Sequence, residues 1–350
     1  MTAIDTAGTT STAITRLVVD GAVQLGIPAS TYTNLLGLAP QHLNDDLYRT
    51  PATSNIRLWE LVALNAPWTE AAVLMTHRSQ LGTLGLWDYL ITAAPTVLEG
   101  IRDASTYLAT MGDASTETLE VVEDGELITV RHVNLADTSY HAACAVRAYA
   151  LGLYLRRMRE AAHRPLTPVR VELATETPPQ HGALIELYGT RAIDFGAPVS
   201  SMTFLAEDLR VPLPHTQPGL SNVLRRHAEL SLAAAIPLHT WIDVFRTALS
   251  AAYNEGALTL PLVAQRLALS PRTLQRRLDD HGTSWSWEVD TVRRTRITQL
   301  LQNTELSVTS IASRTGYADA RALRRAVQRW YGDTPGTVRR TLTTVESPTT

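Results

Sequence analysis

One helical pattern occurs twice in the last third of the chain and restricts what this part can fold into. The segment "RTLQRRL" aligns without a gap on the later segment "RALRRAV". Apolar residues lie four apart in each copy, at Leu274 and Leu278 and again at Leu323 and Val327, which is the spacing of one helical face. Each copy follows a shorter apolar helix, so the sequence predicts two helix-turn-helix units.

The residues around each second helix indicate where it begins and ends. Ser270 and Pro271 form an N-cap followed by a first-turn proline, and Gly282 is placed to end that helix. Asp319 can cap the second copy, whose turn is one residue longer. Residues 284–303, between the two units, predict a long connecting helix.

Positive charge is concentrated in the same third. Residues 256–340 contain 14 arginines and 7 acidic residues, a balance of +7, and the net charge of the whole chain is −3, which leaves −10 for the remainder. All 31 basic residues are arginine. A basic segment on an acidic body is typical of a module that binds a polyanion.

Arginines occupy the face of each second helix that lies opposite its apolar pair. At about 100° per residue, Arg272 and Arg276 lie opposite the leucines of the first copy. Arg321 and Arg325 repeat this arrangement in the second copy. A guanidinium group can bind guanine or a phosphate, so the face suits a major-groove recognition helix. A solvated arginine face would explain one such helix, but the same register in two helices favours DNA recognition.

The repeated segments resemble a known family. The stretch from "VAQRLALSPRTLQRRL" to "GYADARALRRAVQRWYGDTPGTVRR" is similar to the DNA-binding domain of AraC/XylS-type bacterial transcription regulators. Leu323 and Val327 stand where that family usually has phenylalanine, and Ile297 stands where it often has alanine. The resemblance implies that promoter DNA is contacted by Arg272, Thr273, Gln275 and Arg276 of the first helix and by Arg321, Arg324, Arg325 and Gln328 of the second.

The first two thirds of the chain predict a mixture of strands and helices. Alternating runs on both sides of Asp124-Gly125 predict a β-hairpin. Residues 169–174 predict a further strand, and residues 193–205 predict a second hairpin with a longer loop. The segment beginning "DTSYHAACAV" predicts a long helix. This alternation favours an α+β domain.

This part resembles the arabinose-binding-type ligand domain that precedes the DNA-binding domain in a subgroup of AraC-type regulators. The visible matches are Pro95, Phe195, Gly196, Pro198, Phe204, Leu209 and Pro212. The expected fold class is therefore an α+β N-terminal ligand-binding and dimerisation domain, followed by an all-α domain with two helix-turn-helix motifs.

The expected organisation has five parts. They are a disordered tail at 1–13, a ligand-binding and dimerisation domain at 14–236, a linker helix at 237–256, a double helix-turn-helix DNA-binding domain at 257–341, and a tail at 342–350. The linker segment "LHTWIDVFRTALSAAY" has an apolar stripe with helical spacing. This stripe either packs on its own domain or forms a dimer contact, and the sequence leaves both interpretations open.

The sequence contains no motif that would identify an enzyme or a metal site. GxSxG at a strand end, HExxH, a phosphate-binding loop and a dinucleotide-binding GxGxxG are all missing. The histidines are dispersed, and the single cysteine, Cys144, reads as a buried core thiol. Trp87, Tyr89 and Tyr140 are better explained by core filling than by a pocket. We therefore expect no catalytic residue, no metal ligand and no cofactor; the ligand-binding residues are not predicted.

The function predicted from the sequence is that of a ligand-responsive, sequence-specific transcription regulator. Its expected partners are double-stranded promoter DNA, a small-molecule effector, a second copy of the chain in a homodimer, and RNA polymerase. No run of residues is apolar and long enough to span a membrane, and a cytoplasmic, nucleoid-associated location is expected. Two alternatives stay open: a constitutive DNA-binding dimer without ligand control, and a metabolite-processing enzyme with a DNA-binding tail.

Overall fold

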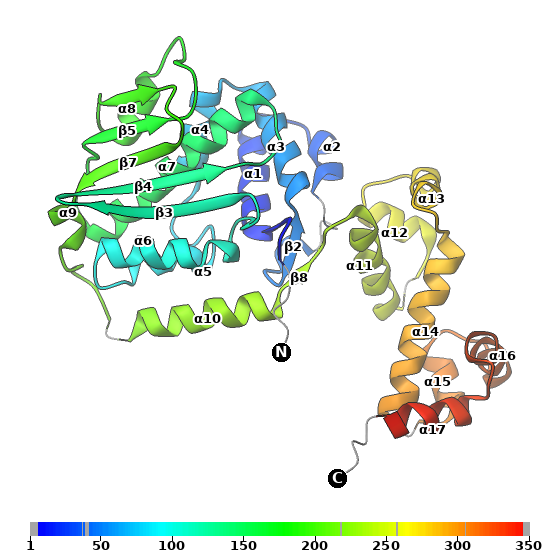
Figure 1. The fold of residues 1–350 in the computed structure, drawn as a ribbon. Helices are drawn as coiled ribbons and strands as arrows, with labels where there is room; N and C mark the ends of the chain where they lie inside the picture. Colours follow the sequence, from blue (N-terminus) through cyan, green and yellow to red (C-terminus); the bar gives the residue numbers. More distant parts are fainter. Residues whose placement is uncertain are drawn as a thin grey trace. The chain divides into compact units, whose positions relative to one another are not determined.

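The computed structural model describes residues 6–345 except 37, 39–41, 218, 257 and 305. It divides into two compact units, Met1–Trp241 and Ile242–Thr350, each of which is described by itself (Figure 1). The first unit contains two sheets and the second is helical in its described residues. The predicted fold class, α+β followed by an all-α double helix-turn-helix domain, is confirmed.

The main sheet of the first unit has the strand order β3-β4-β7-β5-β6. The strands are β3 (Glu117–Asp124), β4 (Leu127–Asn134), β5 (Arg170–Leu173), β6 (Ile193–Phe195) and β7 (Ser200–Leu205). The hairpin predicted around Asp124-Gly125 is confirmed: β3 and β4 are antiparallel with Asp124 opposite Leu127. Gly125 has a φ of 60°, a backbone conformation that favours glycine in such a turn.

The second predicted hairpin is wrong, although both of its strands exist. β6 and β7 are separated by β5, which pairs in parallel with β6 and antiparallel with β7. Parallel neighbours require a crossover, and the helix α8 (Gly182–Tyr188) lies between β5 and β6 in the chain. A local pattern of two strands with a short loop cannot reveal that a third strand lies between them.

The helix α7 (Tyr140–Ala162) lies against one face of the main sheet and forms the centre of the first unit (Figure 1). Around it lie α1 (Thr12–Gln24), α2 (Ala29–Tyr32), η1 (Thr33–Leu35), α3 (Ala52–Asn65), α4 (Trp68–Arg78), α5 (Leu86–Thr92), α6 (Val97–Thr106), η3 (Leu108–Thr110), α9 (Ala206–Arg210) and α10 (Leu220–Ala234). Most of the residues of α7 are buried, because it contacts helices on one side and the sheet on the other.

Aromatic and cysteine side chains of this unit can be compared with their predicted places. Cys144 is fully buried on α7, as predicted, and burial raises the pKa of its thiol. Trp87 is buried and donates its indole N–H to the carbonyl oxygen of Ala104. Tyr89 and Tyr140 are exposed, so core filling is the wrong interpretation for these two.

A small second sheet joins the beginning of the first unit to its end. It has the order β1-β2-β8, with β1 (Thr9–Ser11), β2 (Tyr48–Pro51) and β8 (Ile236–Pro237). β1 is antiparallel to β2, and β8 is parallel to it. The sheet therefore brings residues near the N-terminus beside the segment that leads into the second unit.

The predicted disordered tail at 1–13 is wrong for its described strand residues. Arg49, which is almost fully buried, donates hydrogen bonds to the carbonyl and hydroxyl oxygens of Thr9, both at 2.9 Å, and to the carbonyl oxygen of Gly112 at 2.9 Å. These bonds hold β1 in place, which a Thr- and Ala-rich composition does not reveal. Residues 1–5 lie outside the described residues.

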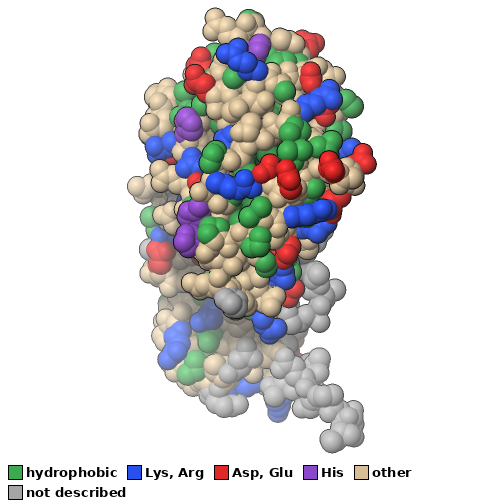
Figure 2. Space-filling model, turned by 90° about the vertical axis from the view of Figure 1, so that its left-hand side faces the viewer, with side chains coloured by type: hydrophobic (Ala, Val, Ile, Leu, Met, Phe, Trp, Pro, Cys, Tyr) green, Lys and Arg blue, Asp and Glu red, His purple; other side chains and the backbone are tan. Residues whose placement is uncertain are grey.

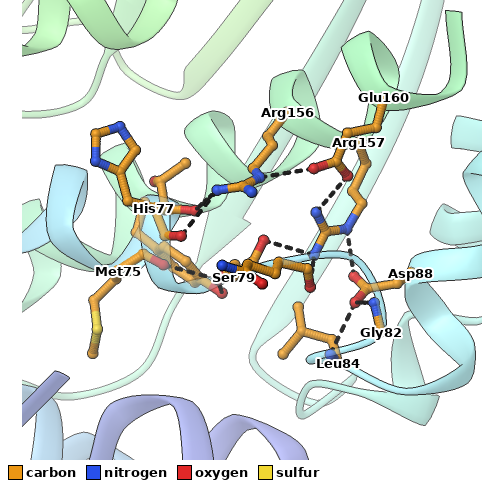
Figure 3. Close-up of polar contacts among 12 residues, drawn as sticks. Met75, His77, Ser79, Gly82, Leu84, Asp88, Arg156, Arg157 and Glu160 are labelled. Carbon is orange, nitrogen blue, oxygen red and sulfur yellow. Dashed lines mark hydrogen bonds and ion pairs between the residues drawn. The ribbon is translucent and has the colours of Figure 1, made fainter. Parts of the chain in front are cut away.

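A buried ion pair joins α7 to α5 (Figure 3). Arg157 and Asp88 are both 0% exposed, and Arg157 Nε lies 2.6 Å from Asp88 Oδ1. Arg157 also donates to the carbonyl oxygens of Ser79 and Gln80, each at 2.9 Å, and to Glu160 Oε2 at 2.7 Å. The guanidinium of Arg157 thus bonds to α5, to the residues that follow α4 and to Glu160 on its own helix.

The same carboxylate also fixes the loop between α4 and α5. Asp88 Oδ2 accepts hydrogen bonds from the backbone N–H groups of Gly82 and Leu84, each at 2.9 Å. A buried charge is tolerated only when its hydrogen bonds are satisfied. The loop conformation and the ion pair therefore depend on one another.

The second unit consists of seven helices in its described residues. They are α11 (Trp241–Asn254), α12 (Leu260–Arg266), α13 (Pro271–Asp280), α14 (Trp285–Asn303), α15 (Val308–Arg314), α16 (Ala320–Tyr331) and α17 (Pro335–Val345). The predicted long connecting helix is confirmed as α14. The turn of the second helix-turn-helix is one residue longer, as predicted. Residues 267–270 join α12 to α13, and residues 315–319 join α15 to α16.

Two predicted boundaries in this part are wrong. The linker helix begins at Trp241, because Ile236 and Pro237 form β8 instead. The expected C-terminal tail is helical up to Val345, since α17 continues through its first four residues. Residues 346–350 of that tail, and residue 257 at the predicted start of the DNA-binding domain, lie outside the described residues.

The apolar stripe of α11 packs within its own unit. Of the predicted stripe, Phe245 and Leu249 are fully buried, and the ring of Phe245 lies 6.5 Å from that of Trp285 on α14. Of the two interpretations that the sequence left open, packing on the domain itself is confirmed for these residues. A role of this helix in dimer formation stays a prediction.

Candidate nucleic-acid interface and N-terminal cavity

The first candidate recognition helix, α13, is fixed at both ends by its own sequence. Ser270 Oγ accepts a hydrogen bond from the backbone N–H of Thr273 at 3.1 Å, so the predicted N-cap is confirmed. At the other end, Gly282 has a φ of 68° and the N–H of Thr283 reaches the carbonyl oxygen of Leu278 at 3.0 Å. Caps of this kind define the helix length without help from a partner.

The second candidate recognition helix, α16, has the same construction. Asp319 Oδ1 accepts a hydrogen bond from the backbone N–H of Ala322 at 2.7 Å, and Gly332 ends the helix with a φ of 70°. Leu323 and Val327 are fully buried, as are their counterparts in α13. Both buried pairs therefore leave the opposite face of each helix toward solvent.

The predicted DNA-contacting residues fall into two groups by exposure and bonding. The exposed ones are Arg272, Gln275, Arg276, Arg321, Arg324, Arg325 and Gln328. Thr273 is half-buried, and its hydroxyl lies 2.8 Å from Ser270 Oγ in the helix cap. Gln328 donates to the carbonyl oxygen of Gly332 at 2.8 Å. Thr273 and Gln328 thus have structural partners, whereas the arginines lie on open surface.

Five arginines on the outer faces of α13 and α16 differ from several other arginines of the same unit, one of which, Arg329, is also on α16. Within the described part of the chain, no ion pair or hydrogen bond involves the side chains of Arg272, Arg276, Arg321, Arg324 and Arg325. In contrast, Arg246 binds Glu288, Arg266 binds Glu255, and Arg329 binds Asp290. Unneutralised guanidinium groups remain available to phosphates and base edges.

Acidic residues of α14 hold the other helices, and the sequence reading missed them. Glu288 is 1% exposed and accepts two hydrogen bonds from Arg246 of α11, both at 2.9 Å. Asp290 pairs with Arg329 at 2.5 Å and accepts from the indole N–H of Trp330 at 3.2 Å, both on α16. The signal in the sequence that could have indicated these contacts was the pair of acidic residues in a helix whose other charged residues are arginines.

Charges on the first unit are arranged differently. Figure 2 shows one face on which arginine and acidic side chains are neighbours and hydrophobic side chains are scattered between them. Among the described residues, Glu123 binds both Arg102 and Arg210, and Arg164 pairs with Asp208 at 3.0 Å. These pairs neutralise charge locally, and the part of the chain outside residues 256–340 is acidic overall, so the first unit does not attract a polyanion.

The first unit encloses a cavity of about 90 Å³ between α3, α7 and the β3-β4 hairpin. Three aromatic side chains, Trp59, Tyr149 and Tyr154, form part of its wall. The side chains of Asn55, Asp113, Glu117, His132 and Asn134 add polar groups. Within the lining no residue is an arginine.

Burial controls the charge of the two titratable side chains that face each other in this cavity. Burial, reinforced by Asp113, raises the pKa of Glu117 to about 7 even though Asn134 donates to its Oε1 at 2.7 Å. Burial lowers the pKa of His132 to about 4, so this imidazole is neutral at pH 7. Its Nε2 lies 3.9 Å from Glu117 Oε1.

Two buried polar atoms of the cavity residues have no hydrogen-bond partner in the described structure: His132 Nδ1 and Asn55 Oδ1. Such atoms cost stability, and in native proteins they often mark a functional site. The sequence reading did not find this site. The signal was present on β4, where His132 and Asn134 continue the inward-facing series of Ile128 and Val130 with polar groups.

Replacing Glu117 with glutamine is expected to stabilise the first unit at pH 8 and to have little effect at pH 4. The folded-state pKa of about 7 lies above the ordinary value of 4.5, so folding of the wild type loses free energy as pH rises between these values. The loss is roughly 3 kcal/mol, at about 1.4 kcal/mol for each pH unit of separation. Urea unfolding of both proteins from pH 4 to 8 measures it.

The effect of His132 on the pH dependence of stability serves as an internal control in that experiment. Its folded-state pKa lies below the ordinary value of 6.5, so it destabilises the fold as pH falls from 6.5 toward 4. This acid-side loss should persist in the glutamine variant. Equal pH dependence of the two proteins above pH 5 would contradict the raised pKa of Glu117.

Two capped recognition helices with open arginine faces, combined with an α+β unit that encloses a polar cavity, define a DNA-binding regulator with a ligand domain. The chain belongs to the AraC family of transcription regulators. Residues 26–213 match the family model described as the arabinose-binding domain of AraC transcription regulator, N-terminal, and residues 263–341 match the model of a helix-turn-helix domain. It is thus an AraC-type transcription regulator that binds double-stranded DNA.

Three individual proteins are similar to this chain. The chain is 27% identical to the ornithine utilization regulator of Pseudomonas aeruginosa over 271 residues, which are 76% of this chain and 77% of that protein. It is 35% identical to the regulator VirS of Mycobacterium tuberculosis over 80 residues, 23% of this chain and 24% of VirS. The crystal structure of transcriptional regulator CdpR from Pseudomonas aeruginosa aligns with 93% of this chain and 97% of its own, with 20% identity and a TM-score of 0.46.

The helices were also considered as possible membrane spans. Among the described residues, no helix has the length and apolar composition needed to cross a bilayer.

Proposed function

We propose that α13 and α16 each enter a major groove of promoter DNA and that their exposed arginines carry the binding. The contact set is that predicted from the sequence: Arg272, Thr273, Gln275 and Arg276 of α13, and Arg321, Arg324, Arg325 and Gln328 of α16. The observation that carries this proposal is the unneutralised arginine face of both helices. Thr273 and Gln328 contribute mainly by fixing the helix ends, since both are already bonded there.

The cavity between α3, α7 and the β3-β4 hairpin is our proposed effector site. Its support is the combination of aromatic walls with buried polar atoms that have no partner in the described protein. Ligand sites in proteins combine mostly apolar walls with a few polar groups in this way. The division into a ligand-binding domain at 14–236 and a DNA-binding domain at 257–341 belongs to the same proposal.

A chain of hydrogen bonds supports communication from this cavity to the linker. Gly112 and Asp113 line the cavity; Gly112 accepts from Arg49, and Asp113 accepts from the N–H of Gly8 at 2.9 Å. Arg49 belongs to β2, and its carbonyl oxygen accepts from the N–H of Leu238, the residue after β8, at 2.9 Å. An effector that shifts residues 112–113 would therefore act on the segment that leads to α11.

The proposal includes two further partners. They are a second copy of the chain in a homodimer, and RNA polymerase at the promoter. We further propose that the effector is bound and released unchanged, so that the protein is not an enzyme; product formation by the purified chain would contradict this. The cytoplasmic, nucleoid-associated location stays a prediction.

The test is binding of the purified full-length protein to the DNA upstream of its own gene, compared with scrambled DNA of equal length and composition. Fluorescence anisotropy at 50 and 200 mM salt separates the two kinds of binding. We expect affinity for both DNAs to fall with salt, because phosphate contacts release counterions, and preference for the upstream DNA to persist. Equal binding to both DNAs, lost together at 200 mM salt, would reduce the interaction to charge attraction.

A further inference from the structure

The cavity of the first unit offers hydrogen-bond acceptors and no cationic side chain. Glu117 and Asp113 supply carboxyl groups, and the described lining contains neither arginine nor lysine. The acceptor capacity of Asp113 is already taken up within the protein, because its oxygens accept hydrogen bonds from the N–H groups of Gly8 and Ser115 and from hydroxyl groups nearby. Glu117 has hydrogen bonds to Asn134 and to the backbone of Asp113, and it retains free capacity because a carboxylate offers about four acceptor positions.

Two further acceptors point to a donor-rich ligand. Asn55 is almost fully buried, and its amide nitrogen is committed to Thr10 and Thr50, which leaves the oxygen Oδ1 without a donor. His132 is 2% exposed and neutral, so one of its ring nitrogens is an acceptor. At pH 8, where Glu117 is ionised, a carboxylate or phosphate ligand would meet like charge and acceptors here, and it would be repelled.

The walls of the cavity suit an apolar body and a cation. The rings of Trp59 and Tyr149 lie with centroids 5.3 Å apart, and Tyr154 lines the same space. Ile14, Val146 and other aliphatic side chains complete the apolar part. Aromatic faces attract ammonium groups, more strongly when water is excluded.

From these contacts we propose that the effector is a small organic amine, bound as its ammonium ion to Glu117 with its apolar body against Trp59 and Tyr149. This inference rests on the proposed effector site and adds the chemical class of the ligand. No covalent bond forms. Because burial raises the pKa of Glu117 to about 7, part of the protein carries a proton on this carboxyl at neutral pH; the arriving ammonium ion replaces that proton, which is released to solvent.

This exchange predicts how affinity depends on pH. Glu117 must be ionised to pair with the ammonium ion, so binding should strengthen from pH 6 to pH 8 and level off above the pKa of about 7. The groups that face Glu117 are Asp113, His132, Asn134, Tyr149 and Tyr154. His132 stays neutral throughout this range and does not add a competing step.

The experiment uses the full-length protein and two matched series of probes: butylamine, 1-butanol and butyrate, and 2-phenylethylamine, 2-phenylethanol and phenylacetate. Thermal shift and calorimetry at pH 8 measure binding. We expect an amine to bind best in at least one series, the matching carboxylate not to bind, and amine affinity to fall at least tenfold at pH 6. Glu117→Gln should weaken amine binding at least tenfold and remove the pH dependence, whereas Glu120→Gln, an exposed position on the same strand, should leave both unchanged.

A second variant separates failure of the ligand class from failure of the site. Val146→Phe places a larger side chain in the cavity wall and should abolish binding of any ligand held there. If an alcohol or carboxylate binds best and Val146→Phe removes that binding, the effector site stands and the amine class is overturned. If amines bind Val146→Phe as well as they bind the wild type, the site itself is wrong. Failure of every amine to bind also overturns the amine class.

Discussion

Replacing Arg321 and Arg325 together with alanine should lower affinity for the upstream DNA by more than 30-fold. Both side chains lie on the open face of α16, and neither has an intramolecular partner in the described chain. An arginine that binds a base or phosphate contributes about 1–3 kcal/mol, so loss of two costs at least ~2 kcal/mol. The fold should not change, because Leu323 and Val327 on the opposite face still fill the core.

The control for this experiment carries the same change of charge. Arg191 and Arg226 are exposed arginines of the first unit, and their double replacement with alanine should alter affinity less than threefold. The α16 variant should also reduce the dependence of log Kd on log salt by up to about two, one for each lost phosphate contact. Similar losses in both double variants would mean that overall charge, and not the face of α16, determines binding.

The second large effect concerns stability and comes from the buried ion pair of α7. Arg157→Met should destabilise the first unit by about 3–5 kcal/mol, because it leaves the buried carboxylate of Asp88 unpaired. It also removes the donor from the carbonyl oxygens of Ser79 and Gln80. Since the free energy of unfolding of a domain is usually about 5–15 kcal/mol, urea or thermal unfolding would show the loss readily.

An exposed ion pair of the same unit provides the comparison. Arg170 and Asp194 are each 55% exposed and lie 2.6 Å apart, yet Arg170→Met should leave the unfolding midpoint close to that of the wild type, because water screens the pair. Equal destabilisation by the two substitutions would show that burial does not set the cost. A normal unfolding midpoint for Arg157→Met would exclude a structural role for the network in Figure 3.

Sequence reasoning succeeded where local chemistry determines the structure. The helix-turn-helix units follow from apolar residues four apart, from the Ser270 and Asp319 caps, and from Gly282 and Gly332 at the ends. Each of these signals acts within one or two helical turns. The hairpin at Gly125 is equally local. Interactions that close within a few residues can be read from the order of residues alone.

Interactions between distant segments were not predictable in this way. The insertion of β5 between β6 and β7, the pairing of β1 with β2, and the cavity all depend on contacts across large separations in sequence. Glu117 and Asn55 became a common site only because β3 and α3 line the same space. The contact residues on DNA are different again, since they depend on a partner and stay a prediction until binding is measured.

The short strand β8 has a consequence for how far the DNA-binding unit can travel. Backbone hydrogen bonds from Ile236 to Leu47 and from Leu238 to Arg49 hold it to β2, and residues 238–240 then lead into α11. Release of these bonds would lengthen the tether by the two residues of β8. At up to about 3.6 Å per residue, this extends the reach of the DNA-binding unit by roughly 7 Å, about two base pairs along DNA. In the homodimer proposed above, a few hydrogen bonds would thus set which spacings between half-sites the two DNA-binding units can occupy together.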